Sequence, residues 1–182
     1  MSEAWVCSTC GETHQEIPFS FAADFPDPVA SFSREEFENR VVAGSDQCIL
    51  DGKNFFLRGL IEIPILGQDE PFLWGVWVTL WERDFDEISD CWEEAGREDH
   101  HGPFKGRIAN KMGMVPDPFN LPVTVRLQRV GQRPVFFVDD PSHPLFLQQK
   151  NGISLQVARQ ISSMVLHGRI VTFEEGSHPI LE

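Results

Sequence analysis

Two cysteines near the start of the chain are spaced as zinc ligands often are. Cys7 and Cys10 are separated by two residues, so both thiols can reach one tetrahedral ion, and Gly11 permits the tight turn around it. His14 follows four residues after the second cysteine and can reach the same point. These three side chains are one ligand short of a closed structural site, in which four protein ligands surround the ion.

The remaining cysteines offer two candidates for the fourth ligand. Cys48 is the first choice, because it precedes a predicted strand and a thiolate completes a tetrahedral set well. Cys91 is the second, since it falls near the end of a predicted helix, where a free cysteine often packs as a small core residue. We therefore expect structural zinc bound by Cys7, Cys10, His14 and Cys48.

Two other interpretations of the cysteine pair stay open. The thiols can be reduced and unliganded, or Cys7 and Cys10 can form a redox pair. A redox pair is expected at the start of a helix in a βαβ unit, where the thiolate is stabilised, whereas extended chain is predicted here. A zinc ribbon, in turn, ordinarily uses two Cys-x-x-Cys pairs, and this sequence contains one.

Length and composition predict one folded domain with a small appended segment at each end. The chain has 182 residues, and 41% of them are hydrophobic, including 15 Phe and 5 Trp, which is enough for a sizeable core. Three closely spaced prolines predict an extended N-terminal segment over residues 1–30 that contains the possible zinc knuckle. An α+β domain is expected over residues 31–170, and a loose C-terminal tail over residues 171–182.

Hydrophobic periodicity predicts the strands. Polar and apolar residues alternate over residues 54–63 and 123–128, as in half-buried strands, and an unbroken apolar run predicts a central strand over residues 72–81. Within that run, Gly75 allows another backbone to approach closely. Turn residues at Asp51-Gly52 and Gly131-Gln132 predict hairpins.

Capping signals and apolar stripes predict four helices. They begin after Ser33, whose capping box uses Glu36, near Arg83, at Pro144 after a capping His143, and after Ser154. The fold class is therefore α+β, with an antiparallel sheet of four or more strands packed by helices and a Cys-x-x-Cys segment at the N-terminus.

The formal net charge of −13, from 28 acidic and 15 basic residues, bears on the choice of partners. It disfavours nucleic acid and anionic membranes, because the electrostatic attraction to phosphate would be reversed in sign. It is compatible with a basic protein partner, although maintaining solubility is the simpler explanation of the charge. The start of the chain lacks the pattern of a signal peptide and no apolar run would span a membrane, so we expect a cytoplasmic protein.

One alternative function is an enzyme of unknown reaction. Arg58 and Glu62 share one face of the strand predicted over residues 54–63, and with Trp74 they could line a pocket that binds an anionic ligand. An exposed ion pair and a core tryptophan are the simpler explanation. No familiar catalytic or nucleotide-binding motif is present in the sequence, so whether the protein is an enzyme stays open.

Five groups of residues together resemble a bacterial family. They are Cys7-x-x-Cys10-Gly11-x-x-His14, Ser45-Asp46-x-Cys48, Phe56-x-Arg58-Gly59 with Ile63-Pro64, Trp74-Gly75-Val76-Trp77 and His143-Pro144-Leu145. On these motifs the chain resembles the domain-of-unknown-function family twenty-one ninety-nine, from about Cys7 to Leu166. The resemblance implies a bacterial protein but no activity and no catalytic residue. The favoured hypothesis is a binding protein with a zinc-stabilised N-terminal segment.

Overall fold

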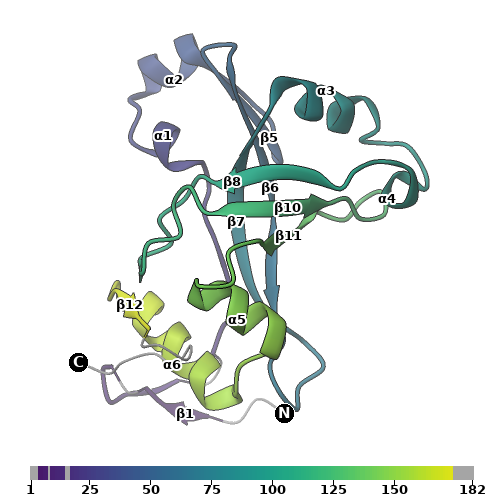
Figure 1. Ribbon diagram of the computed structural model, residues 1–182. Helices are drawn as coiled ribbons and strands as arrows, with labels where there is room; N and C mark the ends of the chain where they lie inside the picture. Colours follow the sequence, from purple (N-terminus) through teal and green to yellow (C-terminus); the bar gives the residue numbers. More distant parts are fainter. Residues whose placement is uncertain (1–3, 8, 15–16, 174–182) are drawn as a thin grey trace.

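A closed barrel of five strands forms the centre of the protein, whose computed structural model describes residues 4–7, 9–14 and 17–173 (Figure 1). In order around the barrel, the strands are β7 (Phe72–Leu80), β8 (Phe104–Ile108), β10 (Pro122–Arg126), β11 (Val135–Val138) and β6 (Asn54–Ile63). β6 then pairs again with β7, which closes the ring. The β11–β6 pair is parallel and the other four are antiparallel.

The expected α+β class is confirmed, with six helices in the described part of the chain, but the sheet is not plainly antiparallel. Besides the parallel closure, β3 (Ser20–Ala22) runs parallel to the first half of β7, whose second half pairs with β8. Alternation along a strand reveals which side chains face the core, but the partner at each edge depends on distant segments. The sequence pattern therefore predicted the strands without predicting the closure.

Two glycines allow strands to approach closely. A Cβ atom at Gly59 would lie 2.4 Å from the ring of Phe136 and 2.6 Å from the carbonyl oxygen of Pro134, so β11 can close against β6 only at a glycine. At Gly75 a Cβ atom would lie 2.8 Å from the Cβ of Ala22 on β3. The predicted close approach of another backbone at Gly75 is thus confirmed.

A second, smaller core lies at one end of the barrel. There β5 (Gln47–Leu50) and β4 (Val41–Ala43) extend the sheet from β6, and α1 (Asp27–Ala30) and α2 (Arg34–Arg40) lie nearby (Figure 1). The buried residues of this core are Val29, Cys48, Leu50, Phe56, Trp77 and Ala109. The capping box of α2 is confirmed, with both hydrogen bonds between Ser33 and Glu36 present.

On the same end, α3 (Glu82–Asp90) begins directly after β7 and buries Phe85 and Ile88, as an amphipathic helix should. The short helix α4 (Arg97–His100) follows. Its buried Arg97 donates hydrogen bonds to the carbonyl oxygens of Gln128 (2.7 Å) and Gln132 (2.9 Å). This guanidinium thus joins the chain after α3 to the loop between β10 and β11.

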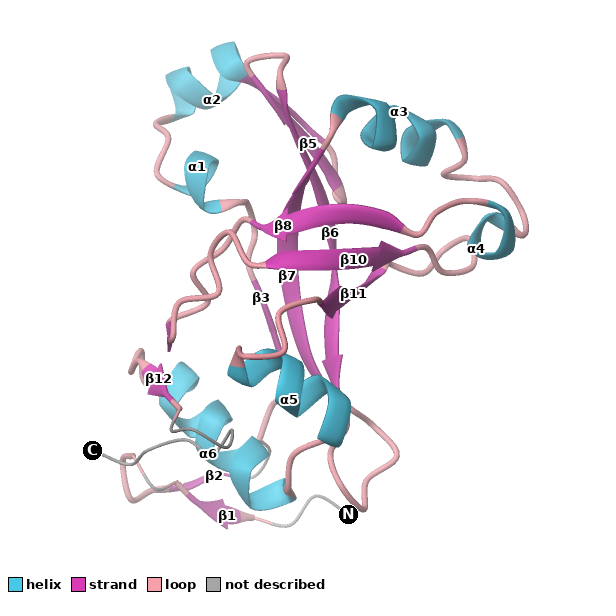
Figure 2. Cartoon of the chain, in the orientation of Figure 1, coloured by secondary structure: helices cyan, strands magenta, loops and turns pink. Residues whose placement is uncertain are grey.

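The N-terminal hairpin and the C-terminal helices lie together at the opposite end of the barrel (Figure 2). Helices α5 (Pro144–Asn151) and α6 (Leu155–Leu166) lie there, together with a separate hairpin of β1 (Trp5–Val6) and β2 (Thr13–His14). The predicted cap of α5 is confirmed, because the His143 ring accepts a hydrogen bond from the amide of Leu145 at 3.2 Å. None of the described helices is long and apolar enough to cross a membrane.

The first residues of the expected C-terminal tail are part of the fold. Val171–Thr172 form β12, which pairs in parallel with β9 (Met114–Val115), and Phe173 is buried. Residues 174–182, which contain the rest of the predicted tail, lie outside the described residues.

The closure at Gly59 generates a testable prediction. Gly59→Ala should lower the free energy of unfolding by about 2 kcal/mol, because the added methyl group overlaps a backbone carbonyl as well as a ring. Urea denaturation measures the difference. The control is Gly44→Ala, where a Cβ atom meets open space and the change should stay within about 0.5 kcal/mol. Equal effects of the two substitutions would contradict the proposed role of Gly59 in closure.

Candidate metal centre

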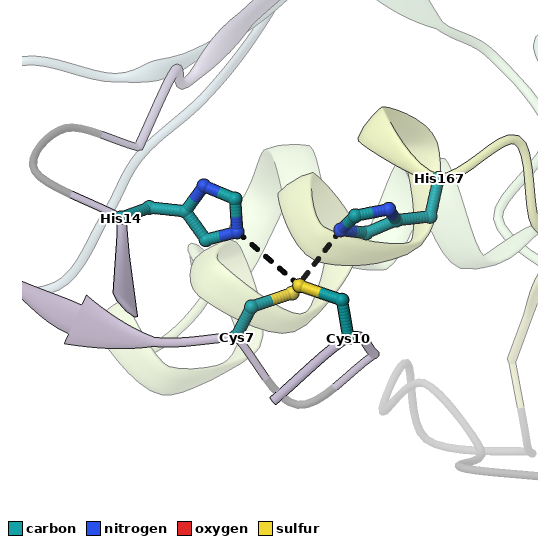
Figure 3. A group of neighbouring side chains, drawn as sticks. All are labelled: Cys7, Cys10, His14 and His167. Carbon is teal, nitrogen blue, oxygen red and sulfur yellow. Dashed lines mark hydrogen bonds between the residues drawn. The ribbon is translucent and has the colours of Figure 1, made fainter. Parts of the chain in front are cut away.

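Four side chains from the two ends of the chain converge beside α6 (Figure 3). They are Cys7, Cys10, His14 and His167, and their sulfur and ring nitrogen atoms all lie within 4.8 Å of one another. The Nε2 atom of His167 lies 3.3 Å from the sulfur of Cys7, and the Nε2 atom of His14 lies 3.4 Å from that of Cys10. Two thiols and two imidazoles thus face one point.

The β1–β2 hairpin presents three of these side chains. Trp5 pairs with His14 and Val6 with Thr13 across the two strands, so His14 lies opposite the first residue of β1, and Cys7 follows directly after the strand. The amide of Cys7 donates to the carbonyl of Glu12 at 2.8 Å, and the amide of Gly11 donates to the carbonyl of Cys7 at 2.9 Å. Gly11 has φ of 75°, a left-handed conformation that favours glycine. The turn thereby places Cys10 beside Cys7.

The fourth side chain, His167, comes from the end of α6. The helix ends there because Gly168 has φ of 64°, and the amide of His167 donates to the carbonyl of Ser163 at 3.3 Å. A cation at this position is also favoured by the partial negative charge at a helix C-terminus. The sequence pattern marked Gly168 as the helix stop but gave no reason to connect His167 with residues so distant in the chain.

The spacing of the four atoms fits a tetrahedral ion. With bonds of about 2.3 Å to sulfur and about 2.0 Å to nitrogen, tetrahedral geometry places a sulfur about 3.5 Å from a neighbouring nitrogen. The observed distances of 3.3 and 3.4 Å are close to this value. The group could therefore hold a metal ion with small adjustments of the side chains.

The surroundings of Cys7 favour its thiolate. The residue is 1% exposed, and its sulfur lies 2.9 Å from the hydroxyl oxygen of Ser163. Burial alone would raise the pKa of Cys7, but hydrogen bonds from the Ser163 side chain and from the amides of Cys10 and Thr9 outweigh it and lower the pKa to about 5. Amide donors aimed at a sulfur stabilise the ionised form in which cysteine binds metals.

Cys10 behaves differently because of its neighbour. A hydrogen bond from the Glu12 amide lowers the pKa of the Cys10 thiol, but burial and the adjacent Cys7 sulfur raise it, and the net direction is upward. Two thiolates this close repel each other, so one thiol of the pair ionises at a lower pH than the other. A divalent cation between them would favour ionisation of both.

Neighbouring side chains hold the cluster in place. The indole of Trp5 stacks on the His14 ring, with 5.4 Å between ring centroids. The Ser163 hydroxyl, besides contacting Cys7, lies 2.8 Å from the hydroxyl oxygen of Thr9. Contacts of this kind around the ligands orient them and are typical of metal sites.

The structure does not bring Cys48, our expected fourth ligand, to the cluster. Cys48 lies on β5 in the second core at the other end of the barrel, fully buried, and burial raises the pKa of its thiol to about 11. Cys91 follows α3, is also buried, and donates its thiol hydrogen to the carbonyl of Ile88 at 3.5 Å. Of the four predicted ligands, Cys7, Cys10 and His14 come together, and His167 occupies the fourth place.

Arg58, Glu62 and Trp74 do not line a common pocket. Trp74 pairs directly with Ile61, so its side chain lies on the odd-numbered face of β6, opposite to Arg58 and Glu62. It is 4% exposed and belongs to the main core, as the simpler interpretation expected. The Arg58 guanidinium instead lies 5.8 Å from the ring centroid of Trp77. The pocket on which the enzyme hypothesis depended is therefore absent from this set of residues.

The fold and the cluster together define an α+β protein with a closed barrel and a Cys/His group that joins its two chain ends. The chain belongs to the family described as uncharacterized protein conserved in bacteria (DUF2199), whose family model matches residues 6–153. This confirms the family that the sequence motifs resembled. The matched part contains Cys7, Cys10 and His14 but ends before α6 and His167. A search of curated proteins and a search of solved structures found no match.

The lowered pKa of Cys7 can be tested in metal-free, reduced protein. The unperturbed thiol pKa is 9.0 and the folded one about 5, so the folded protein has lost a proton between these pH values that the unfolded chain keeps. Folding stability should therefore rise with pH in this range. Ultraviolet absorbance should show one thiolate forming as pH rises through about 5. Cys7→Ser should remove this transition, and a first thiolate only near pH 9 in the unsubstituted protein would contradict it.

Proposed function

We propose that Cys7, Cys10, His14 and His167 bind one structural zinc ion in a protein that acts by binding a basic protein partner. The observation that carries the zinc site is the convergence of four ligand atoms within 4.8 Å, three from an N-terminal hairpin and one from the end of α6. The proposal of a basic partner rests on a different feature, the distribution of charge at the other end of the barrel.

The ligand set favours zinc over other common divalent ions. Two thiolates with two imidazoles in a tetrahedron are a set that zinc readily accepts, whereas calcium and magnesium prefer oxygen ligands. We expect the protein in the cytoplasm, where both thiols stay reduced and available to the ion.

A structural role follows from the number of ligands and from what they join. Four protein ligands leave no coordination position for a substrate or a catalytic water. Within the described residues, the β1–β2 hairpin pairs with no other strand, and an isolated two-stranded hairpin is marginally stable in water. A zinc ion shared with His167 would hold this hairpin against α6.

This proposal predicts which substitutions abolish zinc binding. Purified protein should contain about one zinc ion per chain by elemental analysis, the stoichiometry of a single four-ligand site. Cys10→Ser and His167→Ala should lose most of it. Cys48→Ala and His100→Ala, the latter an exposed histidine at the end of α4, should keep it. Retention of a full zinc content by His167→Ala would contradict the proposed ligand set.

Hydrogen exchange tests the structural role of the ion. Chelation should speed amide exchange in β1, β2 and the last turn of α6, because the bond between them is lost. The barrel strands β6 and β7 should keep their protection, since their pairing does not involve the cluster. Uniform loss of protection throughout the chain would contradict the proposal that the ion stabilises only the contact between the hairpin and α6.

The proposed partner surface combines an exposed tryptophan with concentrated negative charge. Residues 82–99 contain nine acidic residues and two basic ones, and one of the two, Arg97, is buried. Trp81, which directly precedes this segment, is 76% exposed. Exposed tryptophans are enriched among residues that dominate protein interfaces, and an acidic surface steers and selects a basic partner.

The partner proposal predicts charge-dependent binding at α3. Pull-down at low salt should recover a basic protein, which is then purified and titrated with variants. Asp86→Lys with Asp90→Lys, both exposed on α3, should weaken binding on the order of tenfold, and Trp81→Ala by about 2 kcal/mol. Glu35→Lys with Glu70→Lys changes the net charge equally but elsewhere, and should retain most of the affinity. Equal loss in both charge variants would contradict a surface on α3.

A further inference from the structure

The two sulfurs of the cluster are placed so that they could bond to each other. Cys7 and Cys10 are on one turn, and their Sγ atoms lie within 4.8 Å. Formation of a disulfide brings the Cβ atoms to about 3.5–4.5 Å, a distance that residues on one tight turn can reach. Cys10 is exposed, so its side chain can rotate towards Cys7 without displacing core residues.

The exposed residues of the cluster can be reached by small oxidants. Cys10 and His167 are exposed, whereas Cys7 is buried against Ser163. Cys48 and Cys91 are both buried in the cores. A peroxide arriving from solvent therefore meets Cys10 first, and Cys7 is the thiol placed to react next.

We propose that peroxide oxidises Cys7 and Cys10 to a disulfide, releases the zinc ion and frees the β1–β2 hairpin from α6. This inference rests on the proposed zinc site and adds a regulation to it. It combines the zinc and redox interpretations of the cysteine pair. The reduced thiolates bind the ion, and the disulfide that forms on oxidation does not.

The reaction balances with hydrogen peroxide as the oxidant. The Cys10 thiolate attacks one peroxide oxygen, so an S–O bond forms, the O–O bond breaks and hydroxide leaves. The Cys7 thiolate then attacks the Cys10 sulfur, so the S–S bond forms and a second hydroxide leaves. The two sulfurs together lose two electrons, and the two hydroxides take up two protons to give water. The zinc ion loses two of its four ligands and dissociates.

Loss of the ion removes the strongest link between the hairpin and the body. Weaker contacts stay, among them the hydrogen bonds of Ser163 with Thr9 and Cys7, the contact between the His14 and His167 rings and the buried side chain of Trp5. The new disulfide is internal to the hairpin and does not connect it to His167. Oxidation therefore separates the hairpin from α6 and exposes the helix face beneath it.

The test treats the zinc-loaded full chain with equimolar hydrogen peroxide and measures three quantities. A chromogenic chelator should report release of the zinc, hydrogen exchange should rise in β1 and β2, and mass spectrometry should show loss of two hydrogen atoms. Arg34 is the first basic residue, so trypsin releases residues 1–34 as one peptide that contains Cys7 and Cys10 without Cys48 or Cys91. The mass change should lie in that peptide. Dithiothreitol with added zinc should restore the original state.

Two variants separate the steps. His167→Ala should still form the disulfide in the absence of bound zinc, and Cys10→Ser should show no loss of two hydrogen atoms in residues 1–34. Zinc retained under peroxide, or released without the mass change in that peptide, would overturn the regulation and leave the structural zinc site standing. If the untreated protein binds no zinc, the zinc site itself fails and the inference fails with it.

Discussion

The antiparallel pairing of β6 with β7 is the interaction on which the rest of the fold depends. The two strands pair continuously from Phe55 with Leu80 to Ile63 with Phe72. The two faces of this pair contribute to different cores, so Leu57 and Ile61 lie in the main core while Phe56 and Trp77, on the other face, lie in the smaller one. Every other strand of the large sheet attaches to this pair directly or through a neighbour.

The length of this pair also separates the two surfaces of interest. At one end β7 leads into Trp81 and α3, and at the other end an isolated bridge between Ile65 and Ile153 connects the chain after β6 to the start of α6 (Figures 1 and 2). The acidic surface and the Cys/His cluster are therefore held apart by a rigid sheet. Release of the hairpin, as proposed above, would therefore expose the α6 face and leave α3 at the other end of the sheet unchanged.

Local signals in the sequence predicted local features well. The capping box at Ser33 depends on residues three positions apart, and the cap at His143 depends on the proline that follows it. Both could therefore be predicted from residues adjacent in the sequence. The convergence of Cys7, Cys10 and His14 could be predicted for the same reason, since the turn at Gly11 brings them together within eight residues. Signals of this kind need no knowledge of the tertiary fold.

Features that join distant segments could not be found in this way. Cys48 was preferred as fourth ligand for its chemistry, but its strand carries it into the second core at the far end of the barrel. His167 follows an apolar stripe that already explained the helix, and nothing near it indicated a ligand. Closure of the sheet through Val135 and Leu60 depended equally on a pairing between remote residues. Each of these outcomes is decided by packing of the whole chain rather than by local pattern.

The separation of the ligands along the chain explains why a single ion would matter so much. Cys7, Cys10 and His14 are already close in the hairpin, so gathering them costs little chain entropy. His167 adds a link that closes nearly the whole chain, and the entropy of loop closure grows with the length closed. Because the barrel has already brought α6 near the hairpin, most of that entropy is lost on folding and not on binding the ion. His167 therefore joins a prearranged group of side chains, and an ion bound there would couple the position of the hairpin to the integrity of the barrel.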